Sequence, residues 1–181
     1  MNDDDFQKFL DEIGNRPVHD VLTEKDLSAV SDYDLVEIVA EILMKKLPSD
    51  YEQIYKSVIS WTLPQQTIYV IWWLIAEVQN GGFNQFFYNR SEYAPLIPDA
   101  LEKIGALKYA DLAKRAYNVY KKEFENISKH QDGTLEGYSE SCDNNPLEEF
   151  DDEFYDLEES EDLEKLQAEY IRKNRSDFIN G

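Results

Sequence analysis

The strongest hydrophobic pattern lies in the first half of the chain, where residues 68–76 carry no charge. A helix through these residues would be apolar on every side, which is typical of a helix in the middle of a protein. Pro64 suits the first turn of such a helix, and the NGG sequence at 80–82 suits its end, because glycine tolerates left-handed backbone. The pattern therefore predicts a buried central helix from about Pro64 to Gln79.

Elsewhere, apolar residues recur at intervals of three and four, and no segment alternates convincingly with a two-residue period. This spacing predicts amphipathic helices and an all-α fold. The expected helices cover about residues 6–13, 32–47, 49–61, 83–89, 99–104, 107–124, 147–157 and 163–170, with a break near Ser160. A chain of 181 residues without evident repeats is expected to form one domain, a multi-helix bundle around the central helix.

Finer features follow from local composition. Within residues 1 to about 30, the N-terminal helix is expected to be loosely attached, because residues 19–30 lack firm periodicity and are interpreted as a linker or a short helix. Residues 126–145 are polar and contain glycine, which predicts a surface loop. Ser31 is a candidate cap for the helix over 32–47, and Ser49 with Glu52 has the spacing of a capping box.

The composition is strongly acidic, with 18 Lys and Arg against 38 Asp and Glu and a formal net charge of -20. This charge disfavours direct contact with nucleic acid or anionic membranes and favours a basic partner. The single cysteine, Cys142, allows no intramolecular disulfide and no CxxC metal site. We expect a cytoplasmic protein without cofactor, metal or membrane contact, since no apolar run is long enough to span a bilayer. A homodimer is an open alternative to a monomer.

Much of the negative charge lies near the carboxyl end. Between Leu147 and Glu164, eleven of eighteen residues are acidic, which on a helix is roughly one charge per 2.5 Å. Duplex DNA carries about one charge per 1.7 Å. In one interpretation the acids solvate the outer face of a helix, and in the other they bind a positively charged partner. The lack of interleaved Lys and Arg weakens the first, because like charges four residues apart destabilise a helix.

Candidates for catalysis are few. His19 and His130 lie in polar surroundings typical of surface histidines. The chain has no E-x-x-H pair of the kind found in helical di-metal sites, and Gly81-Gly82 lacks the P-loop pattern. Glu77 is the one acid expected to be partly buried, either as a catalytic base or as a structural acid bonded to the following turn. The structural role is the simpler one, so we expect no enzymatic activity.

The segment around the central helix carries a long motif. It starts as WTLPQQ at 61–66, continues as WWL at 72–74 and ends as EVQNGGFNQFFYN at 77–89. Through these residues the chain resembles the DMP-type DNA-mimic proteins, a bacterial family of domains of unknown function with an all-helical fold. The resemblance covers roughly residues 47–178 and includes shorter stretches at 104–106, 109–110, 150–155 and 168–171.

The resemblance implies that an acidic surface imitates the phosphates of DNA. Such a surface would occupy the DNA-binding face of a basic protein, such as a helix-turn-helix regulator, and the protein would act as a decoy and not as an enzyme. The acids expected to bind the partner are Glu148, Glu149, Asp151, Asp152, Glu153, Asp156, Glu158, Glu159, Glu161 and Asp162. The alternative is a protein-interaction or immunity-type module that recognises its partner by shape and aromatic contacts, around Tyr88, Tyr93 and Pro95.

The motif itself is expected to maintain the fold. Its structural residues would be Trp61, Pro64, Trp73, Glu77, Asn80, Gly81, Gly82, Phe83, Gln85, Phe86 and Asn89. Among these, the acid and the three amide side chains would cap and cross-link the helix junction. The phenylalanines, with Phe87, would fill the space beside it.

Overall fold

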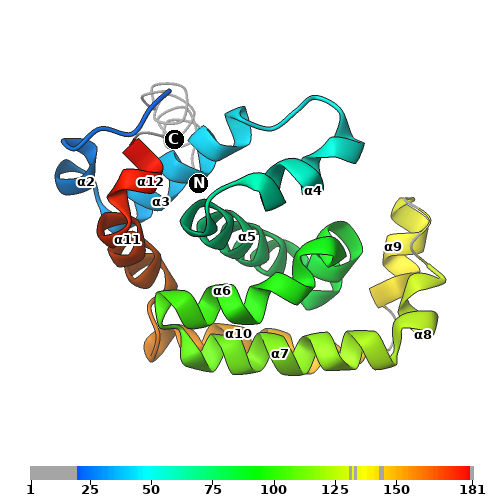
Figure 1. The fold of residues 1–181 in the computed structure, drawn as a ribbon. Coiled ribbons are helices and arrows are strands. Elements are labelled where there is room, and N and C mark those ends of the chain that lie inside the picture. The colour runs from blue at the N-terminus through cyan, green and yellow to red at the C-terminus, as the bar shows by residue number, and fades with distance from the viewer. Residues whose placement is uncertain (1–19, 131, 133, 143–144, 180–181) are drawn as a thin grey trace, which may run out of the picture.

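Helix α5, which spans Leu63–Arg90, passes through the middle of the molecule (Figure 1). The computed structural model describes residues 20–179 except 131, 133, 143 and 144. Ile68 and Ile71 are both 0% exposed, because the helix has no polar face to turn toward solvent. The predicted central helix is confirmed. It begins at Leu63, and its regular geometry is interrupted at Gly81 and Gly82, so the expected helix over 83–89 is the second half of α5.

All regular secondary structure in the described residues is helical, which confirms the all-α class. The predicted break near Ser160 is present, since this residue ends η2 before α11 begins. No helix among these residues is long and apolar enough to cross a membrane. Besides α5, the elements are α2 (Asp26–Ala29), α3 (Asp32–Lys45), α4 (Tyr51–Ser60), the 3-10 helix η1 (Ser91–Leu96), α6 (Ile97–Ile104), α7 (Leu107–Lys122), α8 (Phe124–Ser128), α9 (Leu135–Cys142), α10 (Glu148–Asp156), the 3-10 helix η2 (Leu157–Glu159), α11 (Leu163–Lys173) and α12 (Arg175–Ile179).

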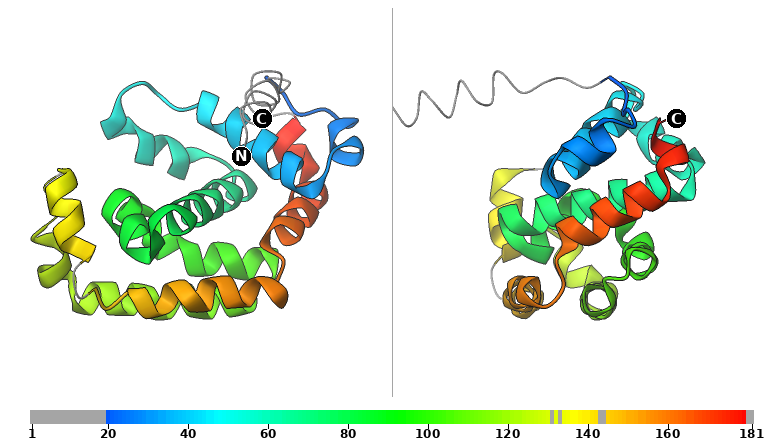
Figure 2. Two further views of the ribbon diagram at one scale, coloured as in Figure 1. Left: turned by 180° about the vertical axis from the view of Figure 1, so that it is seen from behind. Right: turned by 90° about the vertical axis from the view of Figure 1, so that its left-hand side faces the viewer.

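The other helices pack around α5. Helices α6 and α7 form an antiparallel pair below α5 in Figure 1, and α10 lies beside α7 and against α5. Helix α3 packs against both α5 and α11, on another side of the central helix (Figure 2). Apolar side chains from these helices form one buried cluster. The acidic α10 is thereby fixed to the central helix along its apolar side.

Short polar side chains begin two of the helices. Ser31 Oγ accepts the N–H of Asp34 at 3.0 Å, so the predicted cap of α3 is confirmed. The capping box predicted at Ser49 and Glu52 is wrong. Asp50 caps α4 instead, because the helix begins at Tyr51 and the Asp50 carboxylate accepts the N–H of Glu52 at 3.1 Å.

The prediction of a surface loop over 126–145 is wrong in part, because α8 and α9 occupy much of this segment. Ile127 is buried, at 5% exposure. Helix α9 is attached to α5 through polar groups, among them the hydrogen bond from Asn84 Nδ2 to Ser141 Oγ at 2.9 Å. Such a helix has no continuous apolar stripe, which is the feature that identifies a helix in a sequence.

The predicted N-terminal helix falls mostly on residues 1–19, which lie outside the described residues. Residues 20–30 contact the helical domain through two buried leucines, while most of their other side chains are exposed. Leu22 and Leu27 are 1% and 7% exposed, and Arg172 Nε donates to the carbonyl of Leu27 at 2.8 Å. This segment is therefore held by a contact with α11, although its own sequence has no clear helical periodicity.

Candidate functional site

The junction between the two halves of α5 is built around Gly82. Its backbone has φ 74° and ψ -178°, a combination that glycine adopts far more readily than other residues. A Cβ atom there would lie 2.7 Å from Cγ of Asp151 on α10. At Gly81, a Cβ atom would lie 2.5 Å from the hydroxyl of Tyr138 on α9. The two glycines therefore let α9 and α10 approach the backbone of α5.

Asp151 closes this junction from the outside. Its Oδ1 accepts the N–H of Phe83 at 2.7 Å, at the start of the second half of α5. Burial raises the pKa of Asp151 above its ordinary value, although the hydrogen bond from Phe83 acts in the opposite direction. Asp151 is one of the acids expected to bind a partner, and the structure places it in a contact that stabilises the fold. Its position between Leu147 and Phe154 on the buried stripe of α10 is the sequence signal that could have shown this.

Glu77 joins the two halves of α5 from the inside. It is 6% exposed, and its Oε2 accepts a hydrogen bond of 2.8 Å from Gln85 and another of 2.8 Å from Asn89. Arg90 Nε lies 3.4 Å from Glu77 Oε1, and its guanidinium lies 3.7 Å from the centre of a Trp73 ring. Glu77 is thus a structural acid that satisfies donors of the following turn.

The remaining motif residues lie near the start of α5 and in its second half. Trp61 meets the ring of Tyr69 edge-on with centroids 5.2 Å apart, and Pro64 lies in the first turn of α5. Phe83, Phe86 and Phe87 are each 1% exposed. The side chain of Asn80 does not cross-link the junction as expected, because it is exposed and makes no hydrogen bond within the described part of the chain.

Three further acids of the predicted binding surface already have partners. Both carboxylate oxygens of Glu153 accept hydrogen bonds from Arg115 on α7, which raise the pKa of the guanidinium. Glu161 accepts the backbone N–H of Lys108 at 3.0 Å and so caps α7. Asp162 caps α11 by accepting the N–H of Lys165 at 2.9 Å. Glu153 and Glu161 thus connect the acidic segment to α7, and Asp162 uses one carboxylate oxygen to cap its own helix.

The other six acids of the predicted surface are exposed and have no ion-pair or hydrogen-bond partner among the residues that the structure describes. They lie on α10 and η2 and are Glu148, Glu149, Asp152, Asp156, Glu158 and Glu159. Glu148, Asp152 and Asp156 follow one another at four-residue steps, which places them in a row along the outer side of α10. Twelve helical residues span about 18 Å, so the six charges come at roughly one per 3 Å. One strand of duplex DNA carries about one charge per 3.4 Å.

The acidic surface extends to a second helix. Burial raises the pKa of Glu164 on α11, and the charges of Asp162, Glu158, Glu37 and Asp32 raise it further. Two of these residues lie on α3, more than a hundred positions earlier in the chain. The sequence gives no signal for this proximity, because it depends on the packing of α3 against α11.

The alternative function predicts exposed aromatic contacts around Tyr88, Tyr93 and Pro95, but the two tyrosines are not exposed. Tyr93 is 1% exposed and packs edge-on against Tyr69, so it cannot contact a partner. Tyr88 is half-buried against Tyr138 of α9. The large exposed apolar side chains of α4 are instead Tyr51, Tyr55 and Ile59, which share one side of the helix at four-residue steps.

Comparison with known proteins identifies one family. A family model described as DMP19-like protein matches residues 59–174, which is more than half of the chain. The matched range contains the junction in α5 together with α10 and α11. No curated protein and no solved structure matches the chain.

Proposed function

The chain belongs to the DMP19-like protein family, and on this premise we propose that it is an acidic protein-binding module that occupies the DNA-binding face of a basic protein, such as a transcriptional regulator. The single observation that carries the proposal is the set of six exposed carboxylates on α10 and η2 without partners in the described residues. These charges are fixed on a helix that is attached to the core by Phe150 and Phe154.

The spacing of these charges supports a mimic of one DNA strand. About one carboxylate per 3 Å of helix is close to the charge density of a single strand and lower than that of the duplex. Lysine and arginine side chains that normally contact phosphates would pair with the carboxylates by the same long-range attraction. Added salt should therefore weaken the complex strongly, since exposed charges are screened within about 10 Å at 0.1 M salt.

The proposal is one of binding and not of catalysis. Glu77, which the sequence offered as a possible base, uses its Oε2 to hold Gln85 and Asn89. A cytoplasmic location belongs to the same proposal, because DNA-binding regulators meet their sites there.

An affinity capture tests the proposed function. The immobilised protein is incubated with a lysate of its source, and the resin is then split into two portions. One portion is eluted with duplex DNA, and the other with a neutral polymer of similar size. We expect a basic DNA-binding protein in the DNA eluate only, with a dissociation constant that rises steeply with salt. A partner whose binding is indifferent to both DNA and salt would exclude mimicry.

The second candidate function is recognition by shape and apolar contact. The observation in its favour is the exposed row on α4, where Tyr51 is 67%, Tyr55 is 41% and Ile59 is 40% exposed. A partner bound there would not be displaced by DNA, and Tyr51→Ser with Tyr55→Ser would release it. The same substitutions leave a partner bound to α10 in place.

A further inference from the structure

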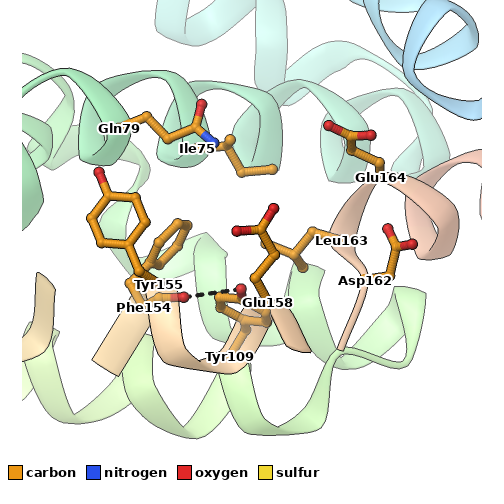
Figure 3. A pocket seen from close by; sticks show the side chains of 9 residues that line it. All are labelled: Ile75, Gln79, Tyr109, Phe154, Tyr155, Glu158, Asp162, Leu163 and Glu164. Carbon is orange, nitrogen blue, oxygen red and sulfur yellow. Dashed lines mark hydrogen bonds between the residues drawn. The ribbon is translucent and has the colours of Figure 1, made fainter. Parts of the chain in front are cut away.

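A cavity of about 190 Å³ lies where η2 and α11 meet the central helix. Figure 3 shows Tyr155 and the carboxylates of Glu158, Asp162 and Glu164 around this space, with Gln79 of α5 on the opposite side. Tyr109 forms part of its wall, and its hydroxyl donates to the carbonyl of Phe154 at 3.0 Å. Burial, followed by the charges of nearby acids, raises the pKa of Tyr109 to about 12. Its hydroxyl is therefore a neutral wall group, and the carboxylates give the cavity its charge.

A second cavity of about 130 Å³ adjoins the first, because Ile75, Gln79 and Glu164 line both. Its wall includes Glu37 of α3 and the ring of Trp72. The indole N–H of Trp72 donates to Glu37 Oε1 at 2.7 Å, which leaves the second carboxylate oxygen for another donor. The two adjoining cavities lie between α5 on one side and α3, η2 and α11 on the other, and together they are called the groove below.

The groove is lined by acceptors of hydrogen bonds. Four carboxylates from three separate elements border it, and the described lining residues include no lysine, arginine or histidine. Gln167 also lines it and is 1% exposed. Its Nε2 donates to the carbonyl of Leu163 at 3.2 Å, whereas its Oε1 has no hydrogen-bond partner among the described residues. An unpaired buried acceptor is unfavourable, so this position favours a ligand that brings donors.

We propose that this groove receives an arginine side chain of the partner protein. The inference rests on the proposed function, and it adds a specific anchor to a surface that otherwise acts through general attraction. In the described residues no group of three or more acidic, histidine or cysteine side chains is arranged to hold a metal ion. A guanidinium has five N–H donors and can reach carboxylates that are too far apart to share one ion. Its plane can also stack on the ring of Tyr155, which lines the first cavity and is exposed, and a lysine ammonium does this less well.

Titration with arginine amide, followed by NMR of the tryptophan indole N–H groups, tests this anchor without the partner. Trp72 lines the groove, whereas Trp61 does not and serves as the internal reference. Trp73 is not used as a reference, because its ring meets that of Trp72 with centroids 5.1 Å apart. We expect the Trp72 resonance to shift and the Trp61 resonance to stay unchanged, with weaker binding of lysine amide and none of citrulline amide. Glu164→Gln and Glu158→Gln should each weaken the binding at least ten-fold. Glu169→Gln, an exposed acid on α11 outside the groove, should change it less than two-fold.

Three results would overturn the anchor. They are an unchanged Trp72 resonance, an equal response to lysine amide, and equal binding by the Glu164→Gln and Glu169→Gln variants. The proposed function is tested separately, since it depends on displacement of the captured partner by DNA. If DNA displaces the partner while arginine amide fails to bind, mimicry stands and the anchor is wrong. If arginine amide binds while DNA fails to displace the partner, the anchor stands and mimicry is wrong.

Discussion

The junction in α5 and the outer side of α10 both depend on carboxylates, but in opposite surroundings. At the junction, Glu77 is buried and Asp151 is half-buried, and their carboxylates accept hydrogen bonds from the amides of Gln85, Asn89 and Phe83. On α10, exposed acids such as Asp152 have no partner among the described residues. Asp151 and Asp152 are neighbours in sequence and differ only in the side of the helix on which they lie. Acidic density alone therefore does not identify a binding surface.

Each class of carboxylate should respond in its own way to substitution. Removing a buried acceptor leaves its donor unpaired, which costs stability. Removing an exposed charge from a surface with a net charge of -20 relieves repulsion and leaves folding nearly unchanged. Stability and partner binding should thus be affected by different sets of acids.

Gly82→Ala should have the largest effect on stability. A side chain at φ 74° is strained and would displace the Asp151 carboxylate. Strain and the lost hydrogen bond together give an expected loss of about 3–5 kcal/mol in urea unfolding. Gly105→Ala is the matched control. Gly105 also has positive φ, 90°, but its nearest neighbour would be 4.0 Å away, so strain of about 1–2 kcal/mol is expected. Equal losses would mean that the approach of Asp151 is unimportant.

Asp151→Ala should have the next largest effect. The N–H of Phe83 loses a charged acceptor, and a hydrogen bond of this kind contributes about 1.5–3 kcal/mol. Asp152→Ala should change the unfolding free energy by less than about 0.5 kcal/mol, because the side chain is exposed and unpaired. Asp151→Asn keeps an acceptor and should be less destabilising than alanine. If Asp151→Ala and Asp152→Ala unfold at the same urea concentration, the distinction between hydrogen-bonded carboxylates of the junction and exposed carboxylates of α10 is wrong.

The pH dependence of stability should show a smaller effect. Burial is the main cause that raises the pKa values of Asp151, Glu92 and Glu164 in the folded state. The folded protein therefore holds these protons more tightly than the unfolded chain does. Their stabilising contribution is full below the ordinary carboxyl pKa near 4 and is lost as the pH rises through the raised values.

Thermal melting followed from pH 7 down to pH 4 measures this effect, because the contribution becomes full near the ordinary carboxyl pKa. The melting temperature should rise as the pH falls, by less than the change caused by Gly82→Ala. Asp20 and Asp132 have lowered pKa values, through their hydrogen bonds to Lys45 and Thr134 respectively. The stability that these two acids contribute is lost only at pH values below their ordinary pKa, outside this range. The variant with Asp151→Asn and Glu164→Gln should have a flatter profile, and an unchanged profile would contradict the assignment.

The sequence predicts the central helix and the break near Ser160 because both depend on local patterns of apolar residues. The role of Asp151 depends on Phe83, 68 positions away. Position 151 nevertheless lies on the apolar stripe of α10 with Leu147 and Phe154, so the spacing of apolar residues indicates that this acid faces the core. The proximity of Glu37 to Glu164 depends on helix packing, and no feature of either segment indicates it. The sequence does not predict helix α9, because the helix is attached to α5 by hydrogen bonds such as that from Asn84 to Ser141 and has no continuous apolar stripe.

A binding comparison of two six-site variants tests the central claim most directly. One variant replaces Glu148, Glu149, Asp152, Asp156, Glu158 and Glu159 by their amides. The other replaces six exposed acids elsewhere, Glu52, Asp99, Glu102, Glu125, Glu136 and Glu169, so both reach a formal charge of -14 by subtracting six from the original 20. With the partner recovered by DNA elution, the first variant should bind at least ten-fold more weakly and with a shallower salt dependence, while the second binds nearly as the natural protein does. Equal weakening of both would show that net charge, and not the surface of α10 and η2, accounts for recognition.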